Sequence, residues 1–193
     1  MKSFSVAGIV LFLLLAGGAA VADEMDLGLK AIEGRLGVVI PENYGTNDLG
    51  ATFMIGGSLD LGTLMENVGI EAGGEFWTKG ESEGAVDVRF TNLAFLGNLK
   101  YILPLEGGFK PFGFGGFGFH FWNSSVDCDE CFGPYWDGDY DDSGVEFGIN
   151  LGAGADLHLE DSSITPTGRA GININGGADY FFIQGGVKLN LSQ

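Results

Sequence analysis

The segment from Val145 to Leu159 alternates strictly between apolar residues and polar or small ones, and it constrains the fold more than any other stretch. A period of two is that of a β-strand with two different faces. The run is longer than the roughly 5–6 residues usual in soluble sheets. It also exceeds the about 9–11 residues that a tilted strand needs to cross a bilayer. An unbroken apolar parity of this length is typical of a strand whose outer face meets lipid.

The same pattern recurs along the chain and predicts eight strands. We place them at residues 31–40, 49–61, 68–76, 85–103, 109–122, 145–159, 164–174 and 181–191. No later segment has the ~18 consecutive apolar residues of a membrane helix, so strands must be the spanning elements. The expected fold class is all-β, an eight-stranded antiparallel up-and-down transmembrane β-barrel. An even strand number is usual in single-chain outer-membrane barrels.

Two of the expected strands do not keep one phase. In residues 85–103, Val86, Val88 and Phe90 share one parity, whereas Leu93 and the apolar residues after it take the other. Either a β-bulge near Thr91 and Asn92 turns the chain over, or the upper part of the strand projects beyond the membrane. Residues 109–122 change phase at Gly115–Gly116 and leave the same ambiguity.

The first 22 residues have the features of a signal peptide. Lys2 supplies a positive charge, residues 6–15 form an apolar core, and Ala20-Val21-Ala22 is a small-x-small cleavage signal. The alternative, a retained helical anchor, needs a longer apolar run. We therefore expect residues 1–22 to be removed on export and residues 23–193 to form one outer-membrane barrel domain.

The net charge of −17 excludes some partners. Such acidity disfavours nucleic acid, and it disfavours binding to anionic lipid by simple attraction.

Two consecutive strands carry a resemblance to a known family. The segments Asn98-Leu99-Lys100-Tyr101-Ile102 and Phe109-Lys110-Pro111-Phe112-Gly113-Phe114-Gly115-Gly116-Phe117-Gly118 resemble the small outer-membrane β-barrel family that includes the outer-membrane proteins A, X and W. The resemblance implies a location in the outer membrane, lipid as a partner, and insertion by the barrel-insertion machinery. The chain departs from the family by ending Asn190-Leu191-Ser192-Gln193, without the terminal aromatic residue that this machinery recognises.

In such a barrel the polar parity of the strands faces the lumen. The inward residues would then be Glu33, Arg35, Asp60, Glu71, Glu75, Glu146, Asp156, His158, Arg169 and Lys188. Eight strands enclose a space that side chains nearly fill, so these charges must pair. A structural salt-bridge and hydrogen-bond network is the main expectation, and a narrow solute path or a proton-linked role is the alternative.

The longest expected loop, residues 123–144, is acidic and presents two candidate sites. Cys128 and Cys131 are spaced as C-x-x-C, and a local disulfide suits them better than a redox or zinc site in an exported acidic loop. Asp137, Asp139, Asp141 and Asp142 form a candidate divalent-cation loop, with Ca²⁺ as the metal suited to hard oxygen donors. An EF-hand is excluded because Asn150 stands where a glutamate is required. No other cofactor is expected.

Neither histidine forms a convincing catalytic group in the sequence. His120 is near Ser124 and Ser125, and His158 shares a strand face with Asp156, but no serine, histidine and carboxylate come together. We therefore predict that the protein is not an enzyme.

The expected function is a structural or surface-interaction role, with a largely plugged lumen and an acidic extracellular loop. One alternative is a narrow channel or transporter for small or hydrophobic solutes. The other is a soluble exported barrel of lipocalin type, which would turn its apolar parity inward.

Overall fold

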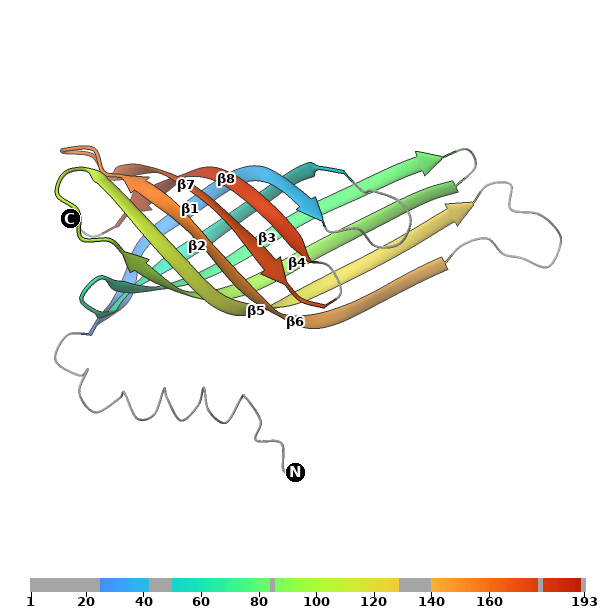
Figure 1. The fold of residues 1–193 in the computed structure, drawn as a ribbon, viewed down its shortest axis with the longest axis horizontal. Helices are drawn as coiled ribbons and strands as arrows, with labels where there is room; N and C mark the ends of the chain where they lie inside the picture. The colour runs from blue at the N-terminus through green and yellow to red at the C-terminus, as the bar shows by residue number, and fades with distance from the viewer. Residues whose placement is uncertain (1–24, 42–49, 84–85, 129–139, 177–178, 192–193) are drawn as a thin grey trace, which may run out of the picture.

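The computed structural model describes residues 25–41, 50–83, 86–128, 140–176 and 179–191, and they form a barrel of eight strands (Figure 1). The predicted signal peptide lies outside the described residues. The strands are β1 (Asp26–Pro41), β2 (Thr52–Met65), β3 (Val68–Glu83), β4 (Val86–Ile102), β5 (Phe109–Cys128), β6 (Tyr140–Leu157), β7 (Ile164–Ile174) and β8 (Tyr180–Asn190). None of the described residues forms a helix long and apolar enough to cross a bilayer.

Each strand pairs antiparallel with the next, and β1 pairs with β8 to close the ring. Closure satisfies the backbone hydrogen bonds of every strand along the barrel, as a bilayer without water requires. The predicted all-β, eight-stranded up-and-down barrel is therefore confirmed. We call the end that carries the short turns after β2, β4 and β6 the turn end, and the opposite end the loop end.

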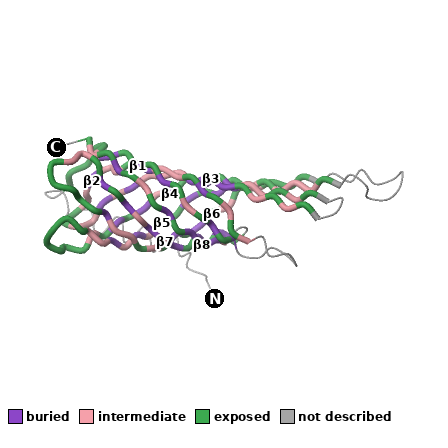
Figure 2. Tube along the Cα trace, turned by 90° about the horizontal axis from the view of Figure 1, so that it is seen from above, coloured by how far each residue is buried: buried purple, intermediate pink, exposed green. Residues whose placement is uncertain are grey.

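The two faces of each strand differ sharply in burial (Figure 2). Outward side chains such as Leu36 and Phe53 are 69% and 85% exposed, whereas inward Arg35 is 3% exposed. The lipocalin alternative is therefore wrong, because the apolar parity covers the outside of the barrel.

β4 and β5 settle the phase ambiguity of the sequence. Their pairing with each other and with β3 and β6 shows no register shift, so the alternative of a bulge near Thr91 is wrong. Phe112 and Phe114 point into the lumen, while Phe117, Phe119 and Phe121 point outward. The apparent change of phase at Gly115–Gly116 arises because the interior itself contains an aromatic layer.

Strands β3 to β6 continue beyond the barrel at the loop end and form a protruding sheet, which is the second alternative for residues 85–103 (Figure 1). The sheet comprises residues 78–83, 86–91, 123–128 and 140–144 of these strands. The predicted loop at residues 123–144 is therefore too long, because β5 extends to Cys128 and β6 begins at Tyr140. Its Asn, Ser and Asp residues resemble a loop, but they pair across strands that leave the apolar zone.

The outward face of these four strands changes from apolar to polar within one step. Phe76, Leu93, Phe121 and Val145 are register partners and form the last apolar row. The next outward row consists of Thr78, Thr91, Asn123 and Ser143. The Thr78 and Thr91 hydroxyls lie 3.1 Å apart and hydrogen-bond to each other. The edge of the hydrophobic zone therefore lies between these two rows.

A pair of arginine substitutions on β6 tests this boundary. Leu151 is 50% exposed in the middle of the outward apolar run, so Leu151→Arg should cost about 2–4 kcal/mol of folding free energy in lipid. Ser143 lies on the same strand face but in the polar row, and Ser143→Arg should change stability little. Urea unfolding in phospholipid bilayers measures both, and equal costs at the two positions would contradict the assigned boundary.

Candidate functional site

The lumen at the turn end is organised around one carboxylate. Asp156 accepts hydrogen bonds from Lys100 Nζ and Lys188 Nζ, each at 2.8 Å, and from Thr167 Oγ1, also at 2.8 Å. These residues come from β6, β4, β8 and β7, so the contact ties four strands together. Lys100 Nζ also lies 3.6 Å from the ring centroid of Phe112, close enough for a cation–π contact.

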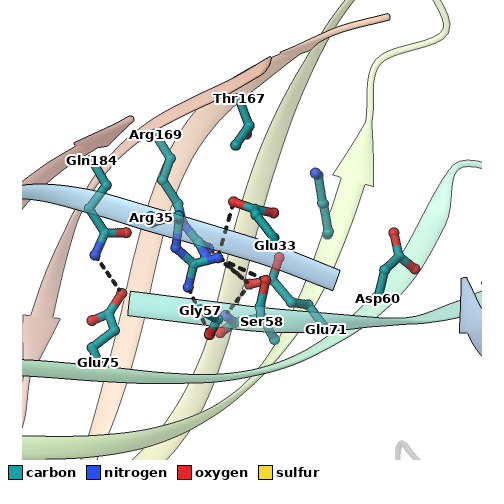
Figure 3. Close-up of polar contacts among 12 residues, drawn as sticks. Glu33, Arg35, Gly57, Ser58, Asp60, Glu71, Glu75, Thr167, Arg169 and Gln184 are labelled. Carbon is teal, nitrogen blue, oxygen red and sulfur yellow. Dashed lines mark hydrogen bonds and ion pairs between the residues drawn. The ribbon is translucent and has the colours of Figure 1, made fainter. Parts of the chain in front are cut away.

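A second cluster is built on Arg35, Glu71 and Arg169 (Figure 3), and Arg169 follows Thr167 of the first cluster by two residues on β7, toward the loop end. Arg35 Nη1 contacts Glu33 at 3.1 Å and donates to Ser58 Oγ at 2.8 Å. Arg169 Nη1 contacts Glu71 Oε1 at 2.9 Å, and Arg35 lies 3.9 Å from the same oxygen. Glu71 of β3 therefore contacts two guanidinium groups, one from β1 and one from β7.

The structure places most of the ten predicted lumen residues inside the barrel. Glu33, Arg35, Glu71, Glu75, Asp156, Arg169 and Lys188 are buried, and Asp60 and Glu146 are half-buried. His158 is a correction: β6 ends at Leu157, and the histidine is exposed beyond it in the turn. The alternation of apolar and polar residues continues to Leu159, so it could not show that the strand ends at Leu157.

Sequence reasoning missed several residues of the two clusters. Lys100 and Asn98 were not identified because the inward face of their strand was ambiguous in the sequence. Both are buried, and they pair with Gly69 and Glu71 of β3. Uncharged Ser58, Thr167 and Gln184 also face inward, as the polar parity of their strands predicts, although they were not counted among the charged lumen residues.

The lumen changes character near the loop end. Glu75 accepts hydrogen bonds from Tyr180 Oη and Gln184 Nε2, both at 3.2 Å, and forms no ion pair with any described residue. Closer to the loop end, Trp77 stacks on Phe90, which stacks in turn on Trp122. The ring of Trp122 covers Gly144, where a Cβ atom would lie 2.9 Å from the indole. This aromatic stack crosses β3, β4 and β5 at the base of the protruding sheet.

Neither histidine forms a catalytic group within the described residues, and the acidic segment is described only in part. The ring nitrogens of His120 are buried without a hydrogen-bond partner among the described residues, so no serine–histidine pair forms there. β6 turns Asp141 and Asp142 to opposite faces of the strand, which prevents them from sharing a cation. Across the described ranges, no group of three or more His, Cys, Asp or Glu side chains could hold a metal. Cys131, Asp137 and Asp139 lie outside the described residues, as does the side chain of Cys128, so the disulfide and the divalent-cation loop both stay predictions.

The protruding sheet has two unpaired edges within the described part of the chain. On one side, the pairing of β2 with β3 ends at Trp77, and residues 78–83 have no neighbouring strand. On the other, the pairing of β6 with β7 begins only at Ile149, so residues 140–144 of the sheet have no neighbouring strand among the described residues. The backbone N–H and C=O groups along these edges are available to another strand.

A closed ring with an apolar outer surface and ion pairs inside defines a small transmembrane β-barrel of the outer membrane. The chain belongs to the outer membrane protein β-barrel domain family, whose model matches residues 8–190. The protein is accordingly located in the outer membrane.

Solved structures of three such barrels share the fold. Neisserial surface protein A matches with a TM-score of 0.54 and 11% identity, covering 83% of this chain and 96% of that one. Ail, the attachment invasion locus protein of Yersinia pestis, matches with a TM-score of 0.50 and 10% identity, covering 85% and 100%. The N-terminal barrel domain of Pseudomonas aeruginosa OprF matches with a TM-score of 0.50 and 14% identity, covering 85% of this chain and 99% of that one. No curated protein matches the sequence significantly.

Removal of the Asp156 carboxylate tests the cluster at the turn end. Asp156→Asn removes the carboxylate that both Lys100 and Lys188 contact at 2.8 Å and leaves only Asp60, 3.9 Å from Lys188, as a counter-charge. It should therefore destabilise the barrel by about 3–5 kcal/mol. The matched control is Asp26→Asn, which removes an exposed ion pair with Lys30 at 2.7 Å and should cost about 0–1 kcal/mol. Urea unfolding of both variants in the same micelles measures the two losses of stability. Similar losses would contradict a greater contribution of the buried cluster than of an exposed ion pair.

Proposed function

We propose that the protein is a plugged barrel that anchors the protruding sheet at the cell surface, where the sheet binds another protein by strand addition. The observation that carries this proposal is the pair of sheet edges, residues 78–83 and 140–144, that have no neighbouring strand among the described residues. Soluble proteins normally shorten, cover or block such edges, because an open edge pairs with other chains. Strand addition obtains affinity from main-chain hydrogen bonds and selectivity from alternate side chains.

The direction of the sheet supports this role. The turns at residues 66–67, 103–108 and 158–163 are short, whereas the sheet and the longer connections lie at the other end. Outer-membrane barrels have short periplasmic turns and long extracellular loops. The protruding sheet is then extracellular, with both chain termini in the periplasm.

The β3 edge can be blocked without disturbing the β3–β4 pairing. Thr52 Oγ1 donates to the carbonyl oxygen of Thr78 at 2.9 Å, so the backbone of Thr78 faces the open side. Alternation along the strand turns the N–H of Ser82 to the same side. Ser82→Pro removes that N–H, and Ser82→Ala is the matched control that keeps it.

Attachment of cells to a surface coated with mixed serum proteins measures the proposed binding. Cells displaying the full chain or Ser82→Ala should attach, and Ser82→Pro should weaken attachment about threefold if β3 is the edge used. Removing residues 80–89 and 125–141, which shortens both hairpins to the polar row, should abolish attachment. Attachment that survives this shortening would contradict a role for the sheet.

The proposed plug predicts that the barrel does not conduct. Eight strands leave little interior space, and the two ion-pair clusters and the aromatic stack, which project into it at successive levels, support the proposed plug. Purified protein in planar bilayers should therefore give no steady single-channel current. Large and stable currents would instead support the alternative of a narrow channel or transporter.

A further inference from the structure

The charges in the lumen are separated by depth. The four buried cations, Arg35, Lys100, Arg169 and Lys188, all contact acidic side chains in the two clusters toward the turn end. Glu75 and Glu146 lie closer to the loop end, and neither forms an ion pair within the described residues. One carboxylate oxygen of Glu146, Oε2, is buried and has no hydrogen-bond partner there. The loop end of the lumen therefore holds two carboxylates and no buried cation.

Three buried polar side chains near these carboxylates also have no hydrogen-bond partner in the described chain. They are Asn92 and His120, each 0% exposed, and Asn173, 1% exposed. An unsatisfied buried polar group costs about 1–3 kcal/mol, and native proteins contain few of them. Three in one region of the lumen indicate that a polar molecule satisfies them.

These groups lie around one level of the barrel. His120 is the register partner of Glu146, and its ring centroid lies 6.0 Å from that of Tyr180. Tyr180 in turn contacts both Glu75 and Trp77. Gly148 has no side chain, and a Cβ atom there would lie 2.9 Å from the imidazole. The carboxylates, the unpartnered groups and the aromatic rings thus line a common region.

We propose that this region binds a small organic ammonium ion with N–H groups, such as a primary alkylamine. The carboxylates of Glu75 and Glu146 supply the opposite charge. Asn92 and Asn173 each have one unpaired acceptor and one unpaired donor, and the acceptors, with a ring nitrogen of His120, suit the N–H groups of an ammonium ion. Trp77 and Tyr180 add apolar walls whose π faces attract cations. An anion is excluded by the carboxylates, and a metal lacks a sufficient ligand set among the described residues. The overall charge of −17 favours the approach of a cation.

The test uses the full-length barrel in a non-ionic detergent and 1,4-diaminobutane as the probe. Titration calorimetry measures affinity, and tryptophan fluorescence reports on Trp77 and Trp122. The diol 1,4-butanediol has the same chain without charge, and tetramethylammonium has charge without N–H groups. Both should bind at least about tenfold more weakly than the diamine, because each lacks the charge-assisted hydrogen bonds.

Substitutions separate the site from general attraction to an acidic protein. Glu146→Gln should weaken diamine binding about tenfold or more. Glu106→Gln removes the same charge from an exposed turn at the opposite end and should change binding less than about twofold, as expected for a distant screened charge. Asn92→Leu removes an acceptor without changing charge and should weaken binding as well. Circular dichroism confirms that each variant keeps its strand content, and Asn92→Leu decides the matter if Glu146→Gln does not fold.

Three results would overturn the proposal. They are equal affinity for the diol and the diamine, equal losses in Glu146→Gln and Glu106→Gln, and no binding of the diamine at millimolar concentration. The last result would mean that ordered water alone satisfies the buried groups. None of these outcomes bears on the proposed strand addition, which concerns the outside of the sheet.

Discussion

The absence of water in the bilayer is the constraint on which the rest of the structure depends. A backbone group without a partner costs several kcal/mol in hydrocarbon, so the eight strands must close into a ring. Closure in turn forces every second side chain inward, into a space too narrow to leave charged groups in bulk water. The ion pairs on Asp156 and Glu71 are the result, and their partners come from strands that are distant in the sequence.

Alternation determined how much of this arrangement could be predicted. Residues 164–174 were predicted as a strand with the bounds that β7 has, because the strand lies wholly within the membrane zone and its two parities never mix. The same reasoning could not assign the inward and outward faces of β4. Phe90 is an inward aromatic residue of the stack, whereas Leu93 belongs to the outward apolar row, so hydrophobicity alone cannot separate the two faces.

The lumen shows a similar division between what parity reveals and what needs coordinates. Parity places Asp156 inside, but it cannot reveal that two lysines from β4 and β8 meet the same oxygen. It also carries no information about strand ends, which is why His158 was placed inside. Nor can it show that Asn92 and His120 remain without partners, since that depends on distances across the barrel.

The polar outer face of the protruding sheet has a consequence for assembly. In the proposed orientation, every group on it, including Arg89, Asp87 and Asp141, must be carried across the hydrocarbon layer before the barrel reaches its final position. A hairpin that slid through lipid alone would expose these groups to hydrocarbon, at a high cost for each charge. The kinetic barrier to membrane entry therefore arises mainly from the part of the protein that ends up outside the membrane. A catalyst of assembly would lower it by providing a hydrated path for β3 to β6.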